Sequence, residues 1–386
     1  VPVEKEINFT QKDKSWTRRF IGDDVYQFSE TEINMDSRIL ASSANLNFTH
    51  TFNPQLAREV TVNADYYYHD SNDDNLTNIY SRTARSNDMS ENSRHIVTDR
   101  DINIYSVKAD YQSVIFNRYM LEAGAKWALS RTYNVTDHDE KATTMSFDNK
   151  FNYSEHVTAA YASFSGQFGP KVAAKFGVRA EYTASKGDWM SIGEVTKDSY
   201  LDFFPTAYIG YNTEKARLSL SYTRRINRPS YSQLNPTPVF IDADNYIVGN
   251  PELKPQYMDA LQAIGGFGQH LQVVLMYAYS GGVVSQSPVF LEDGSEAFKW
   301  SNFGSISQPA AVVSVTELPF TKWLTWTANG TFAYAINKDK STGYKQSAPV
   351  AQVYTCLTAT LPKDWKIQLD LTAMTNVKQA YFKIHP

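Results

Sequence analysis

The feature that most constrains this chain is a strict alternation of apolar and polar side chains over unusually long stretches. Within residues 171–183, Phe176 and Val178 have one parity, and Lys175 and Arg179 have the other. Because successive side chains of a strand point to opposite faces, a period of two predicts a strand with one apolar and one polar face. The same pattern recurs at residues 60–68, 121–129, 216–223 and 365–373.

The length of these alternating stretches indicates that the strands cross a membrane. Strands of soluble sandwiches usually hold about 5–6 residues, whereas transmembrane strands need about 9–11. No apolar run approaches the roughly 18 residues that a membrane helix requires. The mean hydropathy of −0.44 does not argue against a membrane, because a strand with one lipid face and one water face averages to a hydrophilic value.

The connections between the alternating stretches are alternately short and long. The short ones lie near residues 53–56, 116–118, 169–171, 212–215, 268–270, 319–322 and 362–364. The long polar ones lie near residues 70–100, 131–154, 184–199, 224–257, 282–305 and 338–347. Barrels of the bacterial outer membrane have short turns in the periplasm and long loops outside. We therefore predict an all-β fold, a transmembrane antiparallel up-and-down β-barrel, with residues 1–386 forming one barrel domain in contact with outer-membrane lipid.

The hairpin count sets the expected number of strands. Seven hairpins from Ile39 onward give about 14 strands, and Val1–Thr10 and Ala380–Ile384 are candidates for one more each, so we expect about 14–16 strands. An open sheet edge is not tolerated in lipid, and the last clear strand, at residues 364–375, is expected to run outward. We therefore expect the chain to be part of a larger barrel.

Several other classes of protein are disfavoured by composition and motifs. The formal net charge of −4 provides no basic field for nucleic acid. One cysteine, Cys356, leaves no internal disulfide, and the common catalytic motifs are missing, so we expect neither an enzyme nor a cofactor. The acidic groups near residues 70–74 and 137–140 lack the ordered ligand spacing of a calcium loop, and we interpret them as solvated loops with no metal.

Residues 224–236 read R-R-I-N-R-P-S-Y-S-Q-L-N-P, and residues 249–255 read G-N-P-E-L-K-P. This pair of segments resembles the barrel of TonB-dependent outer-membrane receptors, in the branch called the outer membrane protein beta-barrel family. Gln256 stands where that family most often has Glu. The matching positions are Arg224, Arg225, Ile226, Arg228, Pro229, Tyr231, Leu234, Asn235, Pro236, Gly249, Asn250, Pro251, Leu253 and Pro255.

The resemblance implies a receptor wall within a barrel of about 22 strands that takes up a scarce nutrient: a siderophore, an oligosaccharide or a peptide. It also implies a plug domain upstream, through which a TonB-type energy-transducing complex acts; nothing in the first forty residues resembles a plug. A passive porin or adhesion barrel without a gated plug is the alternative. A third hypothesis is that the barrel serves mainly as a docking partner for a surface lipoprotein.

The motif itself has two readings. Its prolines fix φ and lower the entropy of ordering a long excursion over the pore mouth, so the motif shapes the loop. In the second reading the arginines meet plug carboxylates or an anionic ligand, and the tyrosines stack on a sugar. The candidate ligand-binding residues are Arg224, Arg225, Arg228, Tyr231, Asn235, Tyr246 and Asn250.

Overall fold

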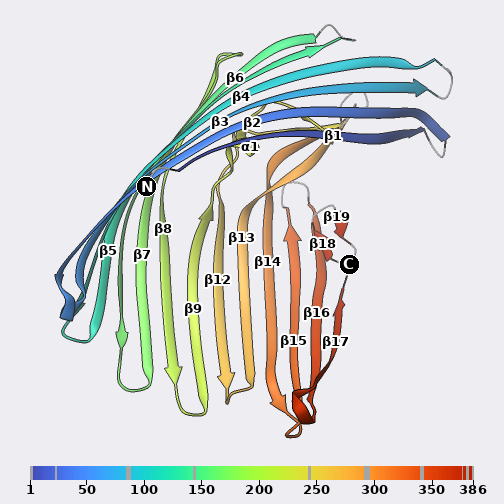
Figure 1. Cartoon of the computed structure of the whole chain (residues 1–386). Coiled ribbons are helices and arrows are strands. Elements are labelled where there is room, and N and C mark those ends of the chain that lie inside the picture. The colour runs from blue at the N-terminus through green and yellow to red at the C-terminus, as the bar shows by residue number, and fades with distance from the viewer. Residues whose placement is uncertain are drawn as a thin grey trace.

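The computed structural model describes residues 3–21, 24–83, 88–141, 145–241, 245–290, 296–339, 343–375, 377–379 and 382–384. Its main element is a single sheet of 17 strands that curls into an open trough (Figure 1). The helical elements are only single turns, such as α1 (Tyr231–Leu234). None of the described helices is both long and apolar enough to cross a membrane.

The strands of the wall follow one another in chain order, each antiparallel to the next. They are β1 Val3–Ile21, β2 Asp24–Asn53, β3 Arg58–Thr83, β4 Ser90–Ile115, β5 Tyr119–Glu140, β6 Met145–Gln167, β7 Val172–Trp189, β8 Glu194–Asn212, β9 Ala216–Asn227, β12 Gln256–Phe267, β13 Leu271–Phe290, β14 Glu296–Pro319, β15 Leu324–Lys338, β16 Lys345–Thr360 and β17 Lys366–Met374. The predicted up-and-down topology is confirmed.

The seven expected hairpins are present as the pairs β2–β3, β4–β5, β6–β7, β8–β9, β12–β13, β14–β15 and β16–β17. The candidate strand at Val1–Thr10 is present from Val3 onward as β1, which extends to Ile21; Val1 and Pro2 lie outside the described residues. The one proposed at Ala380–Ile384 does not extend the wall: Phe382–Ile384 (β19) pairs with Val377–Gln379 (β18) in a separate hairpin, and Ala380 and Tyr381 lie outside the described residues.

The long polar segments were wrongly interpreted as loops. β3 continues to Thr83 and β5 to Glu140, so both acidic groups lie on strands. Above the membrane both faces of a strand meet water, and the apolar signal disappears while the backbone ladder continues. Residues 228–255 are the exception, because they leave the wall as a true loop between β9 and β12.

The two faces of the wall differ in chemistry. Register partners share a face, so Val178 on β7 and Leu220 on β9 can be followed across the sheet to Leu275 on β13. These outer-face side chains are exposed and apolar. The opposite, inner face carries polar groups such as Lys175 and Arg179. This is the arrangement of a membrane wall with lipid outside and water within.

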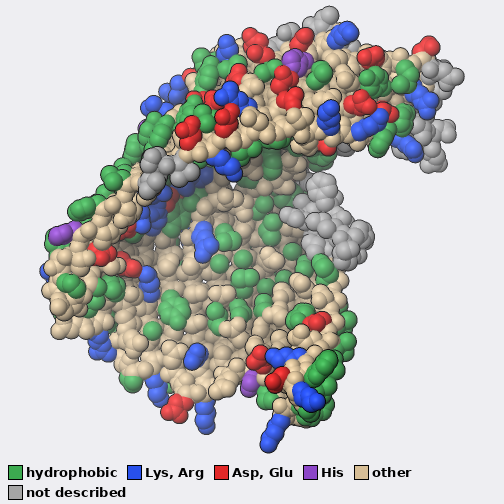
Figure 2. Space-filling model, viewed as in Figure 1, with side chains coloured by type: hydrophobic (Ala, Val, Ile, Leu, Met, Phe, Trp, Pro, Cys, Tyr) green, Lys and Arg blue, Asp and Glu red, His purple; other side chains and the backbone are tan. Residues whose placement is uncertain are grey.

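The wall is uneven in height. β2 holds 30 residues, and β3 and β4 hold 26 each, whereas β12 holds 12 and β17 holds 9. The first strands therefore rise far beyond the level at which the later ones end (Figure 1). Charged side chains gather over this raised part (Figure 2). Within the described residues β1 and β17 are not paired with each other.

Candidate functional site

The motif found in the sequence forms the loop of residues 228–255, here called the motif loop. It contains α1 (Tyr231–Leu234) and two short strands, β10 (Val239–Phe240) and β11 (Asn245–Val248). Its side chains contact residues on the inner face of β5, β6 and β7. The motif loop thus lies inside the trough at the end opposite the short turns.

The three motif arginines occupy different positions. Arg224 has the parity of Leu220 and lies on the outer face, where its Nη1 is 3.9 Å from Oδ1 of Asp259 and its guanidinium is 5.3 Å from the ring centre of Tyr257. Arg225 points to the inner face, is exposed, and forms no ion pair within the described part of the chain. The wall therefore separates two residues that are adjacent in sequence.

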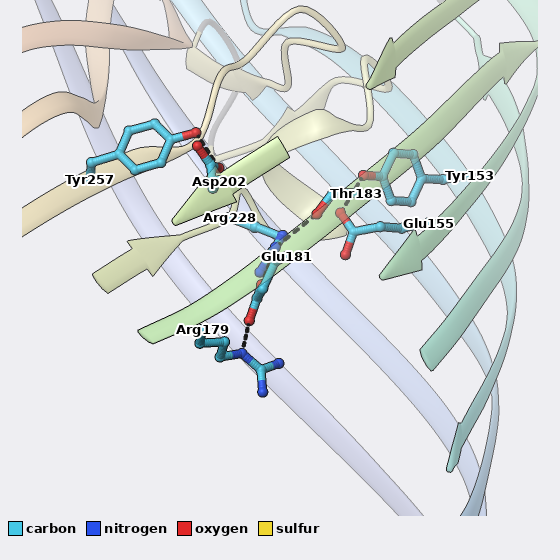
Figure 3. A network of polar contacts seen from close by, with 8 residues as sticks. All are labelled: Tyr153, Glu155, Arg179, Glu181, Thr183, Asp202, Arg228 and Tyr257. Carbon is cyan, nitrogen blue, oxygen red and sulfur yellow. Dashed lines mark hydrogen bonds and ion pairs between the residues drawn. The ribbon is translucent and has the colours of Figure 1, made fainter. Parts of the chain in front are cut away.

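Arg228 ties the start of the motif loop to β7 (Figure 3). Its Nη2 donates to Oε2 of Glu181 at 2.7 Å and to Oγ1 of Thr183 at 2.8 Å. Glu181 is 7% exposed and also accepts from Nε of Arg179. Charge-assisted bonds between buried partners are strong and directional, so this contact fixes where the loop leaves the wall.

Tyr231 begins α1 and is packed against the wall. Its ring centre lies 5.9 Å from that of Phe151 on β6, and Cζ of Arg100 on β4 lies 6.0 Å from the same ring. Ser230 precedes the turn, and its backbone N–H donates to the side chain of Gln233. Burial raises the pKa of the Tyr231 phenol, and the positive charge of Arg100 opposes that rise.

Asn235 and Asn250 join the two halves of the motif. The backbone N–H of Gly249 donates to the carbonyl of Asn235 at 3.1 Å, and that of Asn250 donates to Gln233 at 2.7 Å. The Asn235 side chain accepts from both N and Oγ1 of Thr237. A Cβ at Gly249 would overlap the carbonyl of Asn235. The Gly-Asn-Pro segment is therefore needed for the close approach of two chain segments.

The middle of the motif loop packs on the outer ends of β4 and β5. The ring of Phe240 lies 5.6 Å from His138 and 5.5 Å from Tyr246, and Cζ of Arg94 is 3.6 Å from the Phe240 ring centre. Arg94 also pairs with Glu140 at 3.2 Å, with both side chains almost fully buried. Stacking of an arginine on an aromatic face within an apolar environment stabilises this contact.

The other side of the motif loop is bound to the distant strand β14. Residues 245–248 of β11 run parallel to residues 296–299 of β14. Nδ2 of Asn250 donates to the carbonyl of Trp300 at 3.1 Å. The motif loop thus bridges the trough from β4–β7 to β14.

Side chains at the end of the motif loop and the start of β12 also contact β8, above the point where the ladder of β8 with β9 begins, at Thr206. Nζ of Lys254 lies 3.0 Å from Oδ2 of Asp198, and the hydroxyl of Tyr257 donates to Asp202 at 2.7 Å (Figure 3). Backbone pairing is replaced here by polar side chains.

A pocket of about 420 Å³ lies between the motif loop and the inner face of β6, β7 and β8. Its polar wall includes Tyr153, Glu155, Asp198 and Tyr200, and the hydroxyl of Tyr153 donates to Glu155 at 3.1 Å. Its other wall is formed by the motif loop, with Pro229, Leu234, Pro251 and Leu253 through Pro255. Aromatic rings beside a few convergent polar groups are typical of a small-molecule site.

The structure brings together only part of the predicted set. Tyr231, Asn235, Tyr246 and Asn250 lie within one loop and contact protein groups. Ligand contact by any of the seven candidate residues is still a prediction. The pocket residues of β6–β8 were not identified from the sequence, because nothing in a single sequence shows that Tyr153 and Tyr200 face Pro251.

The comparisons with known proteins agree with this architecture. The model of the "Outer membrane protein beta-barrel family" matches residues 50–386. The chain therefore belongs to that family, and the bacterial outer membrane is its location. No curated protein matches the sequence.

Solved structures of similar fold include several uptake proteins. The siderophore receptor PirA from Pseudomonas aeruginosa is 12% identical, with 96% of this chain and 67% of that chain covered and a TM-score of 0.48. The yersiniabactin uptake receptor FyuA from Yersinia pestis is 10% identical, with 97% and 71% covered and a TM-score of 0.44. The copper transporter OprC is 10% identical, with 93% and 64% covered and a TM-score of 0.51. At these identities the likeness concerns the fold, and the chain spans about two thirds of each.

Proposed function

We propose that this chain is the wall of an outer-membrane receptor that binds a scarce nutrient beneath the motif loop and passes it inward. The observation that carries the proposal is the pocket between the motif loop and β6–β8, which has tyrosines and carboxylates on one side and prolines on the other. A siderophore, an oligosaccharide and a peptide all fit such chemistry. Of the proteins of similar fold named above, PirA is a siderophore receptor, FyuA is a ferric yersiniabactin uptake receptor and OprC is a copper transporter.

The energy source belongs to the same proposal. A plug domain encoded with this wall would close the trough, and a TonB-type complex of the inner membrane would act on it. A surface lipoprotein that covers the outer end is a further partner consistent with the raised strands β1–β6. We propose that the chain binds and transports its ligand without catalysing a reaction.

Bilayer conductance tests the proposal against a passive pore. The full-length protein, purified from outer membranes, is placed in planar bilayers in potassium chloride. A plugged receptor is expected to be nearly silent, and the purified periplasmic domain of TonB is expected to bind it. Steady conductance without TonB binding would contradict the receptor and favour a passive porin.

A further inference from the structure

One row of side chains crosses the inner face of the raised wall beneath the motif loop. Ser71 on β3 is the register partner of Arg100 on β4, and Arg100 is the partner of Asn134 on β5. The next residue of the row, on β6, is Phe151, whose ring packs against Tyr231 of the motif loop. Tyr231 therefore lies over the row, with Arg100 beneath its ring.

Four atoms in this group are buried and have no hydrogen-bond partner among the described residues. They are Oγ of Ser71, Nε of Arg100, Oδ1 of Asn134 and the hydroxyl oxygen of Tyr231. Ser71 is 3% exposed and Asn134 is 0% exposed. Buried polar atoms in folded proteins are almost always hydrogen-bonded, and each exception calls for a physical reason. The four atoms belong to side chains that are neighbours in register or pack on Arg100, so one bound ligand can serve as the partner of all four.

The charge of this group shows what kind of ligand it suits. Arg100 forms no ion pair with any described carboxylate. Its chain neighbour Asp99 has the opposite parity and accepts a hydrogen bond from Asn72 at 2.6 Å. Asp73, on the inner face of β3, accepts one from Ser37. Nε of Arg100 is buried, although the side chain as a whole is only half-buried. A buried N–H group of a cation is unfavourable unless an acceptor, best a negative charge, comes near it.

We propose that Ser71, Arg100, Asn134 and Tyr231 bind a small anion with one negative charge, such as chloride from the external medium. The hydroxyls of Ser71 and Tyr231 and Nε of Arg100 donate to it. Rotating the Asn134 amide by half a turn adds a fourth donor, because Oδ1 then accepts from Thr136, which now receives the amide N–H at 3.0 Å. The anion would hold the first turn of the motif loop against β3–β5, and this inference does not depend on transport.

Thermal unfolding of the full-length protein in detergent provides the first test, with bromide as the probe. At equal ionic strength, sodium bromide is expected to raise the Tm of the unmodified protein saturably by a few degrees relative to bulky sodium gluconate, as for any ligand of the folded state. Arg100→Gln should abolish this rise. Arg225→Gln, which removes an exposed inward-facing arginine of the same loop region, should retain it.

Thermal unfolding in gluconate, without bromide, provides a second test. Arg100→Gln removes a positive charge that no described carboxylate pairs with, so in gluconate it should unfold no earlier than the unmodified protein. An equal response of Arg100→Gln and the unmodified protein to bromide would overturn the proposal.

A crystal of the unmodified protein grown in bromide makes the test independent of any variant. An anomalous peak within hydrogen-bonding distance of Arg100 Nε is expected. Ordinary water density at that position, with no anomalous signal, would overturn the proposal and identify the site as a hydrated polar cluster.

Discussion

At the scale of single residues, the motif is explained by contacts within the protein. Asn235 and Gly249 are 14 positions apart in the sequence and touch through the backbone. The two halves of the motif thus occur together because each packs against the other. The side chain of Asn250, one of the candidate ligand-binding residues, accepts from the backbone N–H of Glu252 and donates to the carbonyl of Trp300.

Gly249→Ala tests this close approach. The added methyl group would overlap the Asn235 carbonyl, so we expect a loss of about 1–3 kcal/mol as the loop shifts. The measurement is the urea midpoint of the protein in lipid vesicles together with proteolysis of the motif loop. Gly266→Ala is the matched control, because its Cβ would meet nothing closer than 3.8 Å; equal effects of the two variants would refute the explanation.

Arg228→Ala tests the attachment of the loop to β7. Removing one partner of a buried ion pair costs about 3 kcal/mol or more, because the carboxylate left behind is less well compensated. We expect faster hydrogen exchange in residues 229–237 and a lower urea midpoint. Arg225→Ala should change the free energy of unfolding by less than about 0.5 kcal/mol, since that side chain is exposed. If the two variants behave alike, the ion pair with Glu181 does not anchor the loop.

At the scale of elements, the sequence predicted those strands whose two faces differ. In β7 and β9 the alternation was visible because one face meets lipid, and their turns fell where expected. It did not predict the upper halves of β3–β6, since a strand with water on both faces has no periodic signal. Nor could it place β11 beside β14, a contact that depends on the whole curl of the sheet.

The contact between β10 and the upper end of β5 should depend on pH. Burial, and secondly the charge of Arg94, lower the pKa of His138, while Glu140 and Asp139 act in the opposite direction. When the loop is detached, the imidazole of His138 has its ordinary pKa of about 6.5. It then binds a proton more readily than in the packed state. The packing is therefore fully stable above that pH and weakens as the pH falls below it.

Hydrogen-exchange protection factors of residues 239–241 and 245–248 are the appropriate measurement. They should decrease from pH 7.5 to pH 5, and His138→Gln should flatten the profile. A profile that is unchanged by this substitution would assign the pH response to another group.

At the scale of the whole molecule, the assignment of faces fixes the position in the membrane. Leu220 lies on the outer face of β9 and Ser221 on its inner face. Leu220→Arg should reduce folding stability in lipid vesicles by about 2–4 kcal/mol, whereas Ser221→Arg should have a small effect, because only the first places a charge against hydrocarbon. The folded fraction after refolding in vesicles reports both. A larger loss for Ser221→Arg would reverse the two faces.

Because the strands differ in length, one flank of the wall projects farther from the membrane than the other. Strands of 26–30 residues stand on one flank. On the other flank β12, β15, β16 and β17 hold 9–16 residues, and β13 and β14 hold 20 and 24. We expect antibodies, phage tails and proteases that arrive from outside to meet the tall flank first, because it projects farther from the membrane. Immune and viral selection should therefore act mainly on residues 24–40, 70–100 and 131–140, and the low rim should diverge more slowly.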